Sequence, residues 1–178
     1  MTNTLLKLKV VKKGFFQIIL RFILFRGISS INLDAKGRIA VPTRYREELQ
    51  DCCERQMVVT VAVNDKCVGE AGCLWLYPLP EWEKLEQTIS KLPTRNKMAG
   101  KLRRFVIGHA TECEMDAQGR LLIPEKLREY AGMDKQLFLV GQLNKFEIWS
   151  DAAWQAKEQE WLDGSDTEGL EELGSLSF

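Results

Sequence analysis

The chain of 178 residues has a single histidine, His109, and no segment with the spacing of a nucleophile motif. A Ser-His-Asp triad or a histidine-rich metal site needs that side chain in suitable company, and a lone histidine is more often structural. A glycine-rich phosphate loop and a cluster of metal ligands are also missing from the sequence. We therefore expect no enzyme, and no catalytic residue, metal, cofactor or small-molecule substrate.

Cysteines are few and do not fall into pairs. The five are Cys52, Cys53, Cys67, Cys73 and Cys113. A disulfide framework favours an even number, and a structural zinc site favours Cys-x-x-Cys pairs, which are absent. A bridge between Cys67 and Cys73 is sterically open, but the count favours free thiols in a reducing cytosol.

No uninterrupted apolar run is long enough to cross a membrane. The run GFFQIILRFILF at 14–25 is broken by Gln17 and Arg21. It falls far short of the ~20 apolar residues that a spanning helix needs. No small-residue cleavage site of a secretory signal follows it, which leaves an interfacial amphipathic helix as the alternative.

Net charge of one sign is also missing, because 25 Lys and Arg balance 25 Asp and Glu. The two ends differ, however: residues 1–23 hold five bases and no acid, whereas residues 158–178 hold seven acids and no base. With 45% apolar and 28% charged residues the composition is that of a globular protein. We expect residues 163–178 to form a disordered acidic tail.

What the sequence does contain is an internal repeat. Residues 32–47 read NLDAKGRIAVPTRYRE and residues 114–129 read EMDAQGRLLIPEKLRE. Two copies of D-A-x-G-R with the same apolar triplet and proline are improbable by chance and indicate a tandem duplication. The similarity continues from 74–82 to 146–154, where the offset is about ten residues smaller. The first copy therefore carries an insertion, which we place at 64–73 as a glycine-containing loop between strands.

Each copy predicts the same small set of elements. A strand (28–33; 111–115) leads into a hairpin turn with Asp34 or Asp116 first and Gly37 or Gly119 last, which suits a type I turn followed by a residue with positive φ. A short strand (39–41; 121–123) precedes a proline-started helix (43–51; 125–131), and buried strands (58–63; 137–142) follow.

These elements predict an α+β fold made of two similar halves. We expect a first repeat over 28–80, a helical linker over 81–109 and a second repeat over 110–155. Neither half of about fifty residues buries much core alone. Packing the halves about a pseudo-two-fold axis solves that problem.

An arginine leaves each turn, at Arg38 and Arg120, and the first turn adds Lys36. Two exposed guanidinium groups on neighbouring hairpins suit duplex DNA, because they bind phosphate or the guanine edge in a bidentate manner. The alternative is that the arginines pair with Asp34 and Asp116 and only rigidify the turns. The two roles are compatible.

Other features have simpler interpretations. Between 89 and 111 lie six bases and no acid; we favour a solvated helix or a subunit contact over a phosphate-binding patch, with Met98, Leu102 and Phe105 packing inward. The pairs Arg46–Glu47 and Arg128–Glu129 are interpreted as surface or interface ion pairs. Aromatic residues at repeat-matched positions are expected in the core: Trp75, Tyr77, Trp82, Trp149 and Trp154.

The segment FRGISSINLDAKGRIAVPTRYREEL and the second DAQGRLLIPEKLREYAG closely resemble the MraZ family of the SpoVT/AbrB-like, swapped-hairpin DNA-binding superfamily. The resemblance covers about 25–155 and implies two tandem SpoVT/AbrB-like halves of a swapped-hairpin β-barrel. It also implies a bacterial transcriptional regulator, cytoplasmic and nucleoid-associated, that binds double-stranded DNA. Members form homo-oligomeric rings on direct repeats in the promoter of the division and cell-wall gene cluster, which includes their own gene.

The resemblance also assigns residues. It makes Arg38 the DNA-reading arginine and Arg120 its counterpart, with Arg26 and Lys36 on the same DNA-facing edge. Family members typically start Met-Phe-Arg-Gly, whereas here Leu24 takes the place of that methionine. We therefore expect residues 1–23 to be a misannotated extension, and no membrane contact if they are not translated. A ring-forming scaffold and an antitoxin-like partner of a toxin are the alternative functions.

Overall fold

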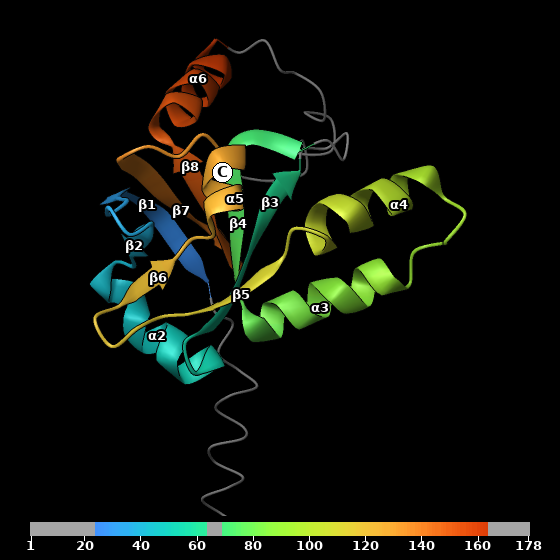
Figure 1. Cartoon of the computed structure of the whole chain (residues 1–178), viewed down its shortest axis with the longest axis horizontal. Coiled ribbons are helices and arrows are strands. Elements are labelled where there is room, and N and C mark those ends of the chain that lie inside the picture. The colour runs from blue at the N-terminus through green and yellow to red at the C-terminus, as the bar shows by residue number, and fades with distance from the viewer. Residues whose placement is uncertain (1–23, 64–68, 164–178) are drawn as a thin grey trace, which may run out of the picture.

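A computed structural model describes residues 24–63 and 69–163 of the chain. Its main element is a six-stranded antiparallel sheet in the order β1-β7-β8-β4-β3-β5 (Figure 1). The strands are β1 (Phe25–Asn32), β3 (Gln56–Val63), β4 (Gly69–Pro78), β5 (Thr111–Glu114), β7 (Gln136–Leu143) and β8 (Lys145–Ser150). The chain therefore has the predicted α+β fold. Residues 69–73, expected in a loop, belong to β4; residues 64–68 lie outside the described part.

A second, two-stranded sheet consists of β2 (Arg38–Ala40) and β6 (Arg120–Leu122). The helices are α2 (Thr43–Cys53), α3 (Leu79–Ser90), α4 (Lys97–Leu102), the π-helical turn η1 (Arg103–Ile107), α5 (Glu125–Tyr130) and α6 (Asp151–Leu162). In Figure 1, α3 and α4 form a hairpin that projects on the side away from the β2–β6 ribbon. No helix of the described residues is long and apolar enough to span a membrane.

The two halves exchange strands. Strand β1 of the first half pairs with β7 of the second, and β5 of the second half pairs with β3 of the first. Strands β4 and β8 pair with each other and join the two hairpins in the middle of the sheet. Each half therefore completes the sheet of the other. The duplication predicted that the two halves pack together, but not which strands they exchange.

The main core lies between the large sheet, the β2–β6 ribbon and helices α2 and α5. Side chains alternate across a strand, so one face of each strand enters this core, as Leu137 and Leu139 of β7 do. The ring of Phe25 lies 4.1 Å from that of Phe146, and Tyr45 packs at 4.9 Å from Phe146. Residues from both halves thus meet in one cluster.

The opposite face of the sheet is covered at two places. The α3–η1 hairpin packs Trp82 on Tyr77, and Thr60 Oγ1 donates to the carbonyl of Val106 over 2.6 Å. Helix α6 packs Trp154 on Trp149. Four of the five repeat-matched aromatics are buried, as predicted. The fifth, Trp75, is half-buried.

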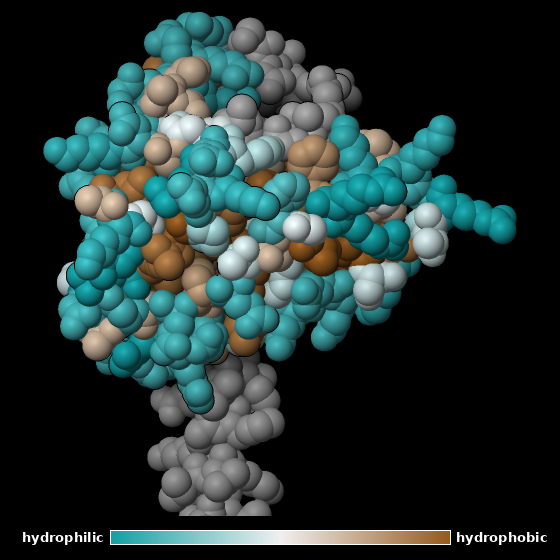
Figure 2. All heavy atoms as spheres, in the orientation of Figure 1, coloured by the Kyte–Doolittle hydropathy of each residue, from teal (hydrophilic) through white to brown (hydrophobic). Residues whose placement is uncertain are grey.

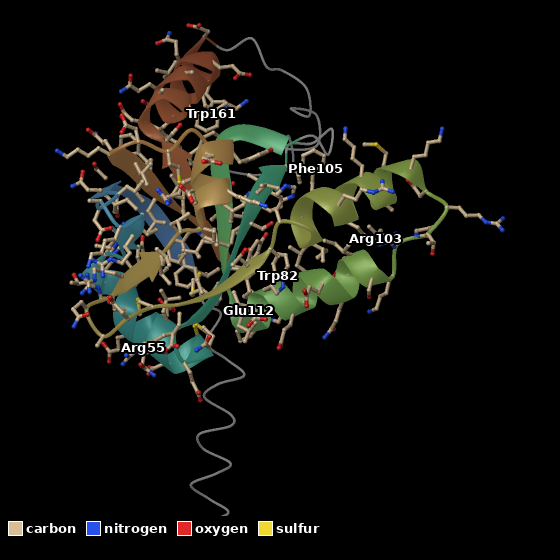
Figure 3. All side chains as sticks on the ribbon, in the orientation of Figure 1. Arg55, Trp82, Arg103, Phe105, Glu112 and Trp161 are labelled. Atoms are coloured by element: carbon tan, nitrogen blue, oxygen red, sulfur yellow. The ribbon has the colours of Figure 1, made fainter. Side chains whose placement is uncertain are left out.

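In the segment 81–109, expected as a helical linker, Met98 departs from its predicted packing. The segment is a hairpin of α3 and α4, with α4 capped by Asn96, whose side chain accepts from the amides of Met98 and Ala99. Met98 is 46% exposed rather than packed. Arg103 donates to the carbonyls of Ile89 and Leu92 and ties the two arms together, and Figure 3 shows it in the hairpin. Arg103, one of the six basic residues between 89 and 111, therefore has a structural role in the hairpin.

The thiols agree with the sequence interpretation within the described residues. Cys52, Cys53 and Cys113 are free thiols. Cys67 lies outside the described residues, as do the predicted extension at 1–23 and the tail from 164 onward.

Candidate nucleic-acid interface

The first hairpin turn is organised by one carboxylate. Asp34 Oδ1 accepts hydrogen bonds from the backbone N–H groups of Lys36 and Arg38, each over 2.9 Å. The N–H of Gly37 donates to the carbonyl of Asp34 over 2.9 Å, and Gly37 has φ of 77°, a conformation that favours glycine. The D-A-x-G sequence therefore forms the predicted turn, with a side-chain cap added inside it.

The same carboxylate orients the arginine. Asp34 Oδ2 lies 2.8 Å from Arg38 Nε and 2.7 Å from Arg38 Nη2. The Arg38 side chain is 26% exposed. Hydrogen bonds from the Arg38 backbone and then from its side chain lower the pKa of Asp34 to about 2. At neutral pH the pair is fully charged, and it fixes the direction in which Arg38 leaves the turn.

The second turn repeats this arrangement. Asp116 Oδ1 accepts from the amides of Gln118 and Arg120 over 2.9 Å, and Oδ2 accepts from Arg120 Nε over 2.8 Å. Partial desolvation acts to raise the pKa of Asp116, but hydrogen bonds from the Arg120 side chain and backbone outweigh it, so the pKa is lowered. Gly119 has φ of 79°. Both arginines are thus paired as the alternative interpretation predicts.

The β2–β6 ribbon brings the two arginines together. Its register places Arg38 opposite Leu122 and Ala40 opposite Arg120. Ile39, between them in β2, is fully buried, so alternation directs Arg38 and Arg120 to the other, outer face. Diagonal neighbours in such a pair are roughly 7–8 Å apart. Figure 3 shows nitrogen-rich side chains gathered around this ribbon.

Hydrogen bonds between the halves lock the ribbon at both ends. The N–H of Val41 donates to the carbonyl of Gly119 over 2.8 Å, and the N–H of Ile123 donates to the carbonyl of Gly37 over 2.9 Å. Each turn is therefore held by the strand that follows the other turn. A two-stranded antiparallel ribbon of this kind fits the major groove of B-DNA.

The sequence interpretation of the helix arginines was wrong. Arg46 and Arg128 form no ion pair with Glu47 or Glu129 among the described residues. Arg46 Nε donates to the carbonyl of Val41 over 2.7 Å, and Arg128 Nε donates to that of Ile123 over 3.0 Å. The recurrence of arginine at the same place in both copies is the sequence signal from which a shared role could have been inferred.

These arginines pack against the turn of the opposite half. A Cβ atom at Gly119 would lie 2.3 Å from Arg46 Nε, and one at Gly37 would lie 2.8 Å from Arg128 Nε. Glycine is needed at both places for the close approach as well as for the backbone. Each guanidinium therefore supports the turn that presents the other half's arginine.

The other two residues predicted to face DNA are Lys36 and Arg26. Lys36 is exposed on the first turn. Arg26 lies in the edge strand β1, exposed and in register with Gln142. It is not part of the ribbon, and its place on a DNA-facing edge stays a prediction.

A second surface is formed by the projecting hairpin. Between α3 and η1 lies a shallow apolar cavity of about 570 Å³ whose lining includes Ile89, Ile107 and Arg104, and Figure 2 shows apolar surface between the two arms. Lys91, Arg95 and Lys97 are exposed nearby. Because the hairpin and the ribbon lie on different sides of the sheet in Figure 1, this basic patch does not extend the arginine pair.

Comparison with known proteins shows to which family the chain is similar. The model of the family described as "MraZ protein, putative antitoxin-like" matches residues 24–105 and again 106–173. The two matches correspond to the two halves that exchange strands.

Individual relatives are similar in sequence over most of the chain. A protein of Methylococcus capsulatus named transcriptional regulator MraZ is 55% identical over 159 residues, which cover 87% of this chain and all of the relative. A Haemophilus influenzae protein of the same name is 50% identical over 146 residues, or 82% of this chain and 93% of the relative. One from Thioalkalivibrio sulfidiphilus is 47% identical over 143 residues, covering 80% and 91%. The chain belongs to the MraZ family.

Proposed function

We propose that this chain is a sequence-specific, DNA-binding transcriptional regulator. Its targets are short direct repeats in the promoter of the division and cell-wall gene cluster, upstream of its own gene. It acts as a ring-shaped homo-oligomer in the cytoplasm, associated with the nucleoid. The relatives' shared name supports regulation of transcription, and ring assembly adds multivalency, so that weak contacts by single protomers combine.

The observation that carries the proposal is the arginine pair on the outer face of the β2–β6 ribbon. Arg38 leaves its turn with one edge of the guanidinium on Asp34 Oδ2 and the Nη1 side without a hydrogen-bond partner among the described residues. A guanidinium presented in this way binds guanine O6 and N7 or a phosphate. The mechanism is insertion of the ribbon in the major groove, with arginines reading bases and surrounding cations contacting phosphates.

The test is a binding titration on the chain's own upstream DNA and on unrelated DNA at two salt concentrations. Wild type should bind its own fragment selectively and lose affinity steeply with salt. Arg38→Ala should remove the selectivity, since one bidentate base contact is worth roughly 1–3 kcal/mol of discrimination. Arg38→Lys keeps the charge without the planar fork and should retain the salt dependence while losing selectivity.

Arg95→Ala is the matched control, because Arg95 is exposed on the hairpin, away from the ribbon. It should bind like wild type. If Arg38→Ala bound the chain's own upstream DNA as selectively as wild type, Arg38 would not be part of the DNA interface. Equal, weak binding of every DNA by all variants would instead favour a ring-forming scaffold.

A second candidate function is an antitoxin-like role, which the family description favours. The DNA-binding ribbon would then control a gene pair rather than a division cluster. A small toxin gene next to this one, whose product binds the chain, would support that role.

A further inference from the structure

The two turns differ at the residue that lies beside the arginine. Lys36 occupies this place in the first turn and Gln118 in the second. The backbone N–H of each donates to the turn carboxylate over the same 2.9 Å. The two turns therefore form the same backbone hydrogen bond. They differ in the side chain at this position.

Gln118 engages the arginine of its own turn. Its Oε1 accepts a hydrogen bond from Arg120 Nη2 over 3.0 Å, and the same Nη2 forms an ion pair with Asp116 Oδ2 at 2.8 Å. An arginine has five N–H donors, of which Nη2 carries two. Two acceptors therefore lie at Nη2 of Arg120, which leaves this nitrogen less available to a base than its counterpart in the first turn.

Lys36 has the opposite effect. Its ammonium group is a donor with no acceptor, so it cannot take a hydrogen from Arg38. Arg38 donates from Nε to Asp34 Oδ2 and forms an ion pair with it through Nη2. Among the described residues no second acceptor lies at its Nη groups, so the Nη1–Nη2 edge faces outward for a base. The first turn thus offers a full bidentate fork and a second positive charge, whereas the second turn offers a partly closed fork and no additional charge.

We propose that Lys36 and Gln118 are specificity-determining residues that give the two halves different tasks on DNA. This inference rests on the proposed function. With its open fork, Arg38 reads a base in a bidentate manner, and Arg120, held by Gln118, makes a single contact with a phosphate. A symmetric ribbon would favour an inverted repeat, because its two halves would read the same sequence in opposite directions. An unequal pair reads an element with a direction, which is what a direct repeat is made of.

The experiment compares four variants of the full chain on its own upstream DNA and on copies with single base substitutions. Lys36→Ala and Lys36→Gln remove the same charge, but only the second introduces an acceptor that can close the Arg38 fork. Lys36→Ala should weaken binding to all fragments alike and flatten the slope of log K against log salt by about one per engaged protomer. Lys36→Gln should show the same loss of affinity and also a severalfold loss of base discrimination.

The second turn supplies the reciprocal change. Gln118→Ala opens the Arg120 fork, and Gln118→Lys opens it and adds a charge. Both should add discrimination at a base position that wild type ignores, and only Gln118→Lys should steepen the salt slope. Circular dichroism of each variant checks that the fold is retained.

Two failures have different meanings. Wild type that binds its own and unrelated DNA equally overturns the proposed function, and this inference with it. If wild type is selective but Lys36→Gln matches Lys36→Ala and both Gln118 variants match wild type in base discrimination, only the division of tasks is overturned.

Discussion

The two halves of the molecule share the backbone conformation of their hairpin turns and differ in the side chains and helices around those turns. In each half a carboxylate shapes the turn, orients an arginine and stands beside a glycine with positive φ. Outside the turns the copies diverge: α2 has 11 residues and α5 has 6, and only the first half continues into the α3–α4 hairpin.

This contrast separates what the fold demands from what is left free to change. The strand exchange requires the same turn and the same backbone hydrogen bonds on both sides of the ribbon. It sets no requirement on the exposed side chain at position 36 or 118, nor on the length of the following helix. A duplicated scaffold can therefore keep its symmetry while its two binding turns acquire different chemistry.

The largest effect is expected where the halves share one core. Phe146 is fully buried and packs against Phe25 of the other half. Phe146→Ala should lower the free energy of unfolding by about 3–5 kcal/mol, the usual range for a buried phenylalanine. Because each half completes the sheet of the other, the loss should appear as one shifted transition in urea, followed by fluorescence and by circular dichroism.

Ile89→Val provides the control in the separate cluster under the hairpin. It should cost about 0.5–1.5 kcal/mol. Two separate transitions in Phe146→Ala, with one half surviving the other, would show that the halves fold as independent units in spite of their shared strands.

The sequence predicted much of this fold because the turn carries its own local information. Asp34 and Gly37 fix a hairpin within four residues, and their second copy at Asp116 and Gly119 indicates the duplication. The partner of each strand is not encoded locally, since an apolar strand such as 137–142 pairs equally well with several neighbours. The exchange of β1 and β5 therefore became visible only in the structure.

The candidate site was predictable to a similar degree. Arg38 and Arg120 could be singled out because they leave the turns, and the structure places both on one ribbon. The role of Arg46 and Arg128 was missed because a neighbouring glutamate suggested an ion pair. Their partners are a carbonyl of their own half and a glycine of the opposite half. Contacts made across a pseudo-two-fold axis leave no trace in the spacing of one copy.

A smaller effect is expected from breaking those supports. Arg46→Met and Arg128→Met each remove a charged donor from a backbone carbonyl and free the space above a turn glycine. Hydrogen bonds to charged groups contribute about 1.5–3 kcal/mol when well shielded, and these half-buried groups should give about 1–2 kcal/mol. Urea denaturation of both variants measures whether the two halves depend equally on their supports.

The corresponding lysine variants sharpen the comparison. Lysine retains a positive charge but has no Nε–H at that place and no planar group to lie on the glycine. Arg46→Lys and Arg128→Lys should therefore recover little of the lost stability. Full recovery by lysine would mean that charge alone matters and that the packing on Gly119 and Gly37 contributes nothing.

The smallest expected effect concerns the turn carboxylates and pH. The folded pKa of Asp34 is about 2, below the value of roughly 3.9 for an unfolded chain. A depressed folded pKa contributes stability that is present above the unfolded value and is lost as the pH falls through the folded one. Asp34 should therefore stabilise the protein at neutral pH and lose this contribution between pH 4 and pH 2.

Asp34→Asn isolates this contribution, because an asparagine oxygen still accepts from the amides of Lys36 and Arg38 while the negative charge that pairs with the Arg38 guanidinium is gone. In urea titrations at pH 7, 4 and 2, the variant should be less stable than wild type at pH 7, and the gap should close at pH 2. Asp116→Asn should show the same sign of change, since the pKa of Asp116 is also lowered. A gap that stays constant with pH would assign the effect to turn geometry, and the charge on Asp34 would then serve to orient Arg38 without stabilising the fold.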